Sequence, residues 1–220
     1  MLGRVFRYQG GLWRVLNTLT DIMALSVLWL LCSLPVLTLG AATTALYDSV
    51  VRCIRYKQPK PYARFFRTFK NELIPGILLT LMWGAVAALG LWMLTLLRQY
   101  SAASPSAGAA GAAYYVALVV PLGAACWVFP TLSRCALGFG ALNATALKLA
   151  VGHLPSTVIL VLMTAELARL SVRWLYPLAF MPAVMMLLWS LFTEPVFKKH
   201  GAGISAPEEE DGAGAPDGGE

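Results

Sequence analysis

The chain has 220 residues, of which 58% are hydrophobic and only 13% are charged. Soluble domains carry about 25% charged residues, so this composition excludes an ordinary soluble domain and indicates an integral membrane protein. The formal net charge is +6, but the Lys and Arg residues fall between apolar segments, as the loops of membrane proteins place them. This distribution argues against nucleic acid as a partner and makes the lipid bilayer the first expected one.

Apolar stretches long enough to cross a hydrocarbon core of about 30 Å recur along residues 1–200. We expect these residues to form one all-α, polytopic transmembrane helix bundle. About five spans are expected, in addition to a broken, re-entrant-like segment near the N-terminus. In chain order, the expected spans are Thr18–Leu34, Leu73–Leu97, Tyr114–Leu132, Leu154–Ala168 and Leu175–Phe192.

The first apolar run is interrupted by Pro35 and Gly40. Pro lacks a backbone N–H and Gly adds backbone freedom, so the pair breaks a helix. The following apolar piece, Gly40–Val51, has about twelve residues and would extend roughly 18 Å as a helix, too short for a full span. We expect the chain to turn back here, although one kinked span is the alternative. Because freed backbone groups at membrane depth need protein or a water-lined cavity around them, function is most expected at this break.

The distribution of basic residues predicts the orientation. If the chain turns back at the break, 14 basic residues lie on one side of the membrane and 3 on the other, whereas a single crossing gives 11 and 6. The positive-inside rule favours the first arrangement, which places both termini in the cytoplasm.

Two other segments have a composition that predicts a loop or a tail. Ser101–Ala113 consists mainly of Ala, Ser and Gly and predicts a flexible external loop. Residues 201–220 combine Gly, Ala, Pro and acidic residues without an apolar face, which predicts a disordered tail.

Residues 62–72 combine aromatic and basic side chains at helical spacing. Their pattern predicts a helix in the membrane interface, with aromatic residues in the acyl boundary and cations toward the headgroups. A docking surface for a cytoplasmic partner is the alternative. The aromatic face would hold Tyr62, Phe65, Phe66 and Phe69, and the polar face Arg64, Arg67 and Asn71.

The few polar residues inside or beside the apolar runs are expected to pair. We predict an Asp48–Arg52 ion pair, and a pair between Glu194, at a helix end, and an arginine in a loop. Asn17 and Asp21 share one helical face at the interface. Gly84 and Ala88 predict close helix packing. The sequence has no nucleotide-binding, hydrolase or metal-binding motif, so we expect no enzyme activity, cofactor or metal.

Four blocks of this sequence resemble the YesL-like family of bacterial membrane proteins, which is catalogued as a domain of unknown function. The first block is Asn17 and Asp21 leading to Cys32–Ala41 and Thr44–Tyr47, and the second is Phe65 and Phe66 with Phe69–Asn71. The third is Val128–Pro130 with Arg134 and then Asn143 and Ala144, and the fourth is Glu194–Lys199. The resemblance implies a bacterial plasma-membrane protein that is often encoded beside carbohydrate ABC transporters. The candidate residues taken from these blocks are Asn17, Asp21, Pro35, Thr38, Gly40, Thr44, Tyr47, Phe66, Lys70, Pro130, Arg134, Asn143, Glu194 and Phe197.

Two hypotheses for function follow. The first is a non-enzymatic accessory or scaffold in carbohydrate uptake that associates with ABC-transporter subunits. The second is a small transporter or channel whose substrate path runs along the broken segment Pro35–Tyr47, lined by Thr38, Thr43 and Thr44.

Overall fold

The computed structural model describes residues 11–101, 105–135, 137–173 and 180–199, and every regular element in these ranges is a helix. The prediction of an all-α protein is confirmed for this part of the chain. The α-helices are α1 (Gly11–Cys32), α2 (Leu39–Ser49), α3 (Pro61–Asn71), α4 (Leu73–Ser101), α5 (Pro105–Arg134), α6 (Phe139–Gly152), α7 (Leu154–Arg173) and α8 (Met181–Lys199). A short 3-10 helix, η2 (Val36–Thr38), precedes α2, and a π-helical segment, η3 (Val50–Arg55), follows it.

Three helices among the described residues are long and apolar enough to cross a membrane. The spans are Leu73–Gln99 in α4, Ala113–Arg134 in α5 and Leu154–Ser171 in α7, and α1 adds the shorter apolar stretch Leu16–Cys32. These helices fit a membrane protein, but the expected count of five spans is not confirmed. The fifth expected span, Leu175–Phe192, begins outside the described residues and overlaps α8, whose Glu194 and two lysines all follow Phe192.

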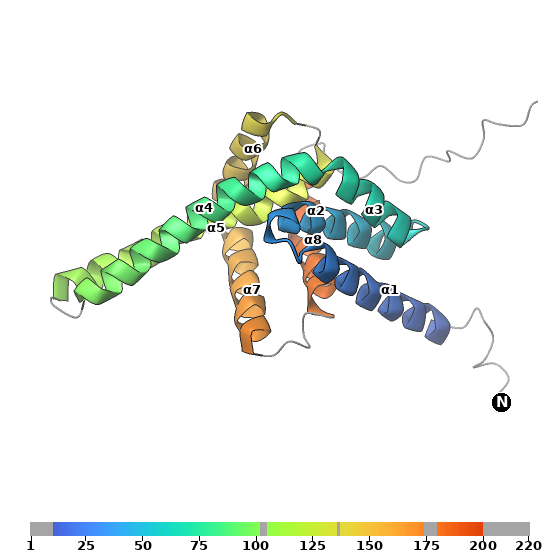
Figure 1. Cartoon of the computed structure of the whole chain (residues 1–220), viewed down its shortest axis with the longest axis horizontal. Coiled ribbons are helices and arrows are strands. Elements are labelled where there is room, and N and C mark those ends of the chain that lie inside the picture. Colours follow the sequence, from blue (N-terminus) through green and yellow to red (C-terminus); the bar gives the residue numbers. More distant parts are fainter. Residues whose placement is uncertain (1–10, 102–104, 136, 174–179, 200–220) are drawn as a thin grey trace, which may run out of the picture.

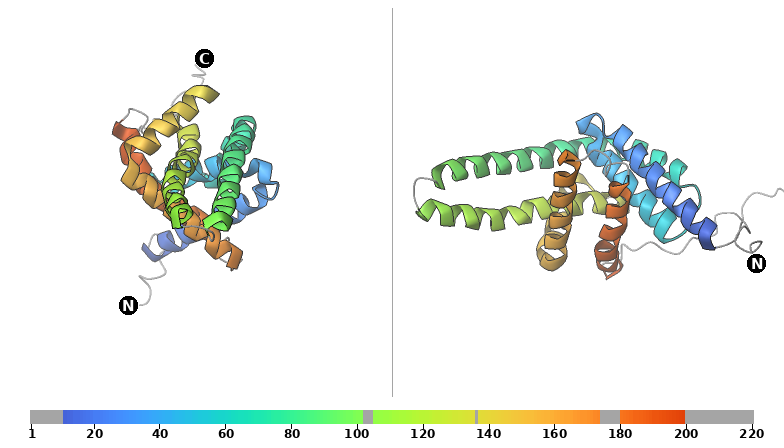
Figure 2. Two further views of the ribbon diagram at one scale, coloured as in Figure 1. Left: turned by 90° about the vertical axis from the view of Figure 1, so that its left-hand side faces the viewer. Right: turned by 90° about the horizontal axis from the view of Figure 1, so that it is seen from below.

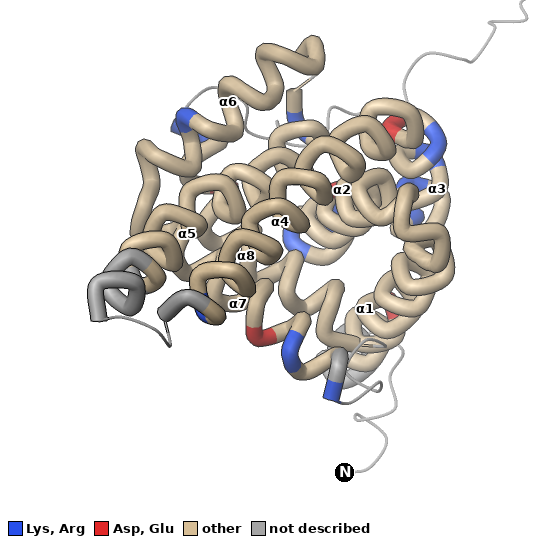
Figure 3. Tube along the Cα trace, turned by 60° about the vertical axis from the view of Figure 1, so that its left-hand side comes forward, with Lys and Arg blue, Asp and Glu red and all other residues tan. Residues whose placement is uncertain are grey.

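The long hairpin of α4 and α5 extends away from the rest of the molecule, while α1, α2, α3 and α8 gather around its other end (Figures 1 and 2). Charged residues are sparse along most of this hairpin and are concentrated around α3 (Figure 3). The largest fully buried side chains include Trp127, Tyr47 and Phe65. The core therefore lies where α2 meets α3, α5 and α8, away from the tip of the hairpin.

The chain reverses direction between α1 and α2, as the Pro35–Gly40 break predicts (Figure 1). The Thr38 hydroxyl donates to the carbonyl oxygens of Cys32 at 2.6 Å and Pro35 at 2.7 Å. Protein groups therefore satisfy the end of α1. The tip is apolar and outward-facing, since Leu34 is 74% exposed and Val36 is 71% exposed.

Gly40 lies where the backbone of α2 comes closest to that of α4. Its N–H donates to the Thr80 hydroxyl at 2.9 Å. A Cβ atom at Gly40 would lie 2.6 Å from the Gly76 carbonyl oxygen, and one at Gly76 would lie 2.6 Å from the Ala41 nitrogen. These separations are too short for any side chain, so the crossing requires glycine on both helices.

Two packing and loop predictions are wrong. Pro105–Ala113 forms the first turns of α5 instead of a loop, because alanine is the strongest helix former and proline is favoured at the first helical position. Gly84 and Ala88 are exposed, and a Cβ at Gly84 would meet nothing within 4 Å. Gly90 makes the contact between α4 and α5 instead, because a Cβ there would lie 2.6 Å from Leu118 Cδ1. The predicted tail over residues 201–220 lies outside the described residues.

The α2–α4 crossing predicts different outcomes for two glycine substitutions. Gly40→Ala should destabilise the protein by about 1–3 kcal/mol, because the added methyl group overpacks a backbone contact. Gly84→Ala, in an open helical position, should be neutral or stabilising by up to about 1 kcal/mol. Thermal unfolding of both purified variants in the same detergent measures the difference, and equal midpoints would contradict a close α2–α4 contact.

Candidate functional site

Asp48 is a buried carboxylate that connects α2 to the two elements that follow it. Its Oδ1 accepts a hydrogen bond from Arg52 Nε at 2.8 Å, and its Oδ2 accepts from Arg64 Nε at 2.9 Å and from the Thr68 hydroxyl at 3.0 Å. The predicted pair with Arg52 is confirmed. Arg64 and Thr68 lie on α3, so the same carboxylate also fixes α3 against α2.

Glu194 is the second buried carboxylate, and its side chain is only 1% exposed. Its Oε1 accepts hydrogen bonds from Arg134 Nη2 and from the Tyr47 hydroxyl, the latter at 3.2 Å, while its Oε2 accepts from the Tyr56 hydroxyl at 3.0 Å. The Tyr47 and Thr193 hydroxyls are 2.6 Å apart. Glu194 does pair with an arginine, but it lies inside α8 and is wholly buried, rather than at a helix end.

The cluster around Glu194 brings together α2, α5, α8 and the residue that follows η3. The Arg134 guanidinium lies 5.6 Å from the centre of the Tyr47 ring, so the aromatic face partly compensates its burial. Its Nε and Nη1 have no hydrogen-bond partner among the described residues. The charges of Arg134 and Glu194 balance, and both oxygens of the Glu194 carboxylate accept hydrogen bonds. This arrangement is suited to holding helices in place.

A second connection between η3 and α8 reinforces this cluster. Arg55 Nη1 donates to the backbone carbonyl and, at 2.8 Å, to the hydroxyl of Ser190. Arg55 and Tyr56 reach α8 from adjacent positions because η3 is a π-helix, whose wider turn changes the direction of the side chains. Such turns occur frequently at functional sites.

The connection between η3 and α3 contains two residues in an unusual backbone conformation. Lys57 and Lys60 have φ angles of 58° and 63°. Residues other than glycine rarely adopt this left-handed conformation, which is sterically disfavoured. The Gln58 N–H donates to the Arg52 carbonyl at 3.0 Å and helps to hold this turn.

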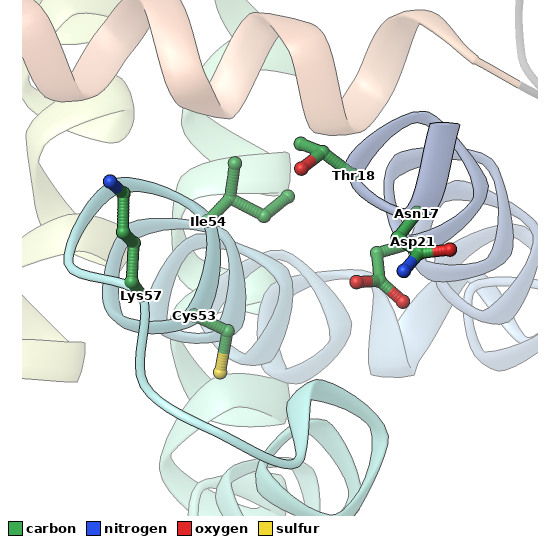
Figure 4. A pocket seen from close by; sticks show the side chains of 6 residues that line it. All are labelled: Asn17, Thr18, Asp21, Cys53, Ile54 and Lys57. Atoms are coloured by element: carbon green, nitrogen blue, oxygen red, sulfur yellow. The ribbon is translucent and has the colours of Figure 1, made fainter. Parts of the chain in front are cut away.

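A pocket of about 330 Å³ opens between α1 and η3 (Figure 4). Two of the predicted residues, Asn17 and Asp21, line it together with Thr18, Cys53, Ile54 and Lys57. The Tyr62 hydroxyl of α3 donates to Asp21 Oδ1 at 2.7 Å. This hydrogen bond raises the pKa of Tyr62 to about 12, so the phenol keeps its proton at physiological pH.

The threonines expected to line a substrate path all bond to nearby backbone carbonyls. Thr43 donates to Leu39 at 2.6 Å, and Thr44 donates to Gly40 at 2.9 Å. Thr38 caps α1, as described above. These hydroxyls therefore stabilise the helical reversal, and the pocket between α1 and η3 does not include them.

The remaining predicted residues lie apart from one another. Phe66 and Lys70 are on the exposed side of α3, and Pro130 lies inside α5. Phe197 packs edge-on against Trp127, with ring centres 6.1 Å apart. Asn143 is in α6, where its side-chain oxygen accepts a hydrogen bond from Trp83 Nε1 at 2.9 Å.

The prediction for the aromatic face of α3 needs correction. Phe65 is fully buried and Phe69 packs against the core, so neither reaches the acyl chains of the bilayer. Phe66, by contrast, is 46% exposed. Arg64 is also turned inward, onto Asp48. Two of the four aromatic residues expected to contact lipid, Phe65 and Phe69, therefore pack against protein, whereas Tyr62 and Phe66 are exposed.

Sequence reasoning missed Tyr56, Arg55 and Arg64 as members of these clusters. A signal for them did exist, because residues 1–200 contain only five acidic residues against 17 basic ones. A buried carboxylate must find partners, so each of these rare acids could be expected to collect several donors. Which donors they are depends on the helix arrangement.

The Arg134–Glu194 pair predicts a large effect for a small substitution. Glu194→Gln should destabilise the protein by about 3–5 kcal/mol, because it leaves a buried cation without its counter-ion. The matched control is Glu166→Gln, since Glu166 pairs with Arg169 on exposed α7 with side chains 69% and 78% exposed. That change should alter stability by at most about 1 kcal/mol.

Thermal unfolding in detergent distinguishes the two variants. The double variant Arg134→Met/Glu194→Met should be more stable than Glu194→Gln, because it removes both charges. Equal unfolding midpoints for Glu194→Gln and Glu166→Gln would show that the buried pair does not hold the helices.

Part of the chain matches a known family model. Residues 22–95 match a family model described as "Protein of unknown function, DUF624". No curated protein and no solved structure matches the chain. The matched region begins in α1 and ends in α4, so it includes the reversal at Pro35 and the Asp48 cluster but excludes Arg134 and Glu194. Over this region the chain is similar to a family whose function is not known.

Proposed function

We propose that this protein is a non-enzymatic membrane adaptor that presents α3 to a partner protein. The observation that carries the proposal is the Asp48 cluster, which uses Arg64 and Thr68 to fix α3 on the helical body. Arg67 and Lys70 are exposed and have no partner among the described residues. A rigidly mounted helix with outward cations and the exposed Phe66 has the composition of a docking surface.

We propose subunits of a carbohydrate ABC transporter as the partner. The resemblance of four sequence blocks to YesL-like proteins supports this choice, because such proteins are often encoded beside these transporters. The α3 segment also lies within residues 22–95, the part of the chain that matches a family model.

We further propose a location in the bacterial plasma membrane with both termini in the cytoplasm. The reversal between α1 and α2 supports this orientation, because with α8 as a fourth crossing besides α4, α5 and α7 it is the arrangement that divides the basic residues 14 to 3. It also places α3 on the cytoplasmic side, where a cytoplasmic subunit could reach it.

Reporter fusions at residues 10 and 201 should both report a cytoplasmic location, because the basic residues are retained inside. In whole cells, a membrane-impermeant thiol reagent should label Ser106→Cys. The matched variant Lys60→Cys should be labelled only after the cells are opened. An external N-terminus with an internal C-terminus would instead require a single crossing by α1 and α2.

Photo-crosslinking in native membranes tests the docking surface directly. A benzophenone side chain at Phe66 should crosslink to a permease or ATPase subunit of a carbohydrate transporter. Phe139 on α6 is the matched control, because the two side chains are 46% and 45% exposed. Arg67→Glu/Lys70→Glu should reduce the crosslink at position 66, since it reverses the charge of the surface.

The pattern of crosslinks separates the possible outcomes. Crosslinks from position 66 to lipid alone would overturn the adaptor proposal. Equal crosslinking to the same subunit from positions 66 and 139 would show that α3 is not the specific contact.

A further inference from the structure

We propose that the pocket between α1 and η3 binds the headgroup of a zwitterionic phospholipid with a primary amine, that is, a phosphoethanolamine ester. The pocket measures about 330 Å³. This is at the lower end of the range for ligand sites, a size suited to a headgroup rather than a whole lipid.

The carboxylate of Asp21 is the group that would bind the amine. Figure 4 shows it directed from α1 into the space that faces Ile54 and Cys53. The Tyr62 hydroxyl donates to Oδ1, and Oδ2 has no hydrogen-bond partner among the described residues. An ammonium group can donate to this second oxygen.

Lys57 also lines the pocket and carries its positive charge, on the other side of Ile54 from Asp21 (Figure 4). It forms no ion pair with any described residue, and its left-handed backbone, with φ of 58°, holds it in the turn after η3. Burial raises the pKa of the Cys53 thiol to about 11, so this lining group is neutral. Among the described lining residues, the pocket therefore has one carboxylate and one side chain that ends in an ammonium group, the two charges that an amine joined to a phosphate requires.

The surroundings of the pocket favour a lipid over a soluble zwitterion. On α1, the apolar residues Leu16, Met23 and Val27 are 45%, 51% and 41% exposed and form the stripe that neighbours Asn17. Acyl chains could lie along this exposed apolar stripe while the headgroup enters the pocket.

The test compares lipids that share acyl chains but differ in their headgroups. Purified full-length protein is mixed with phosphatidylethanolamine, phosphatidylcholine or phosphatidylglycerol in detergent, and retained lipid is counted by native mass spectrometry. We expect retention of the ethanolamine lipid over the choline lipid by about tenfold or more, because a quaternary ammonium has no N–H to donate to Asp21. Equal retention of these two lipids would overturn the proposal.

Substitutions assign this preference to the pocket. Asp21→Asn should abolish the preference for the ethanolamine lipid. Tyr62→Phe is the matched control, because it removes the hydrogen bond to Asp21 but keeps the carboxylate, and it should retain the preference. Lys57→Gln should weaken retention of the ethanolamine and choline lipids alike, since both have a phosphate. A preference unchanged in Asp21→Asn would overturn the proposal.

The alkylation of Cys53 can be measured on the unmodified protein, so this test does not depend on whether a variant folds. The ethanolamine lipid should slow alkylation of Cys53, followed by peptide mass spectrometry, and the choline lipid should not. Absence of protection would overturn the proposal. Soluble glycerophosphoethanolamine supplies the same headgroup without acyl chains. If it protects Cys53 as well as the lipid at equal concentration, the ligand is a soluble zwitterion and the lipid assignment is wrong.

Discussion

Buried carboxylates need several donors in a medium where water is scarce, and two such groups organise this helical membrane protein. Asp48 gathers donors from η3 and α3, and Glu194 gathers donors from α2, α5 and the end of η3. Because the two carboxylates lie on α2 and α8, their hydrogen bonds connect most of the helices that meet in the core. Apolar packing selects one helix arrangement less strongly in a membrane, because the lipid around the helices is as apolar as their side chains. The polar contacts therefore supply much of the specificity of the arrangement.

The segment from α2 to α3 shows how this constraint shapes a surface. α2 is almost entirely buried, and η3 widens into a π-helix where its arginines and Tyr56 must reach different partners. The turn through Lys57 and Lys60 then returns the chain so that Arg64 meets Asp48. As a result, α3 turns its aromatic residues Phe65 and Phe69 inward and leaves Phe66, Arg67 and Lys70 outside.

The reversal between α1 and α2 depends on other contacts than the buried carboxylates. The Thr38 hydroxyl donates to the carbonyl of Cys32, the last residue of α1, and Gly40 allows α2 to approach α4 at backbone distance. The outer side of the reversal is apolar, with Leu34 and Val36 exposed. The break therefore lies at a packed contact between helices, whereas the pocket lies at the opposite end of α1, beside Asn17 and Asp21.

The sequence by itself determined the all-α class, the membrane character, the reversal at Pro35 and the Asp48–Arg52 pair, because each depends on composition or on neighbours within a few residues. The predictions for Ser101–Ala113 and Gly84 are wrong for local reasons as well. The helical propensity of alanine makes Pro105–Ala113 part of α5, and a small residue such as Gly84 does not by itself bring another helix close. Only the tertiary structure decided that Arg134 meets Glu194 across 60 residues, and that Asp21 and Lys57 line one pocket. Such pairings depend on the relative placement of whole helices, and many cations in this basic chain could have served either carboxylate.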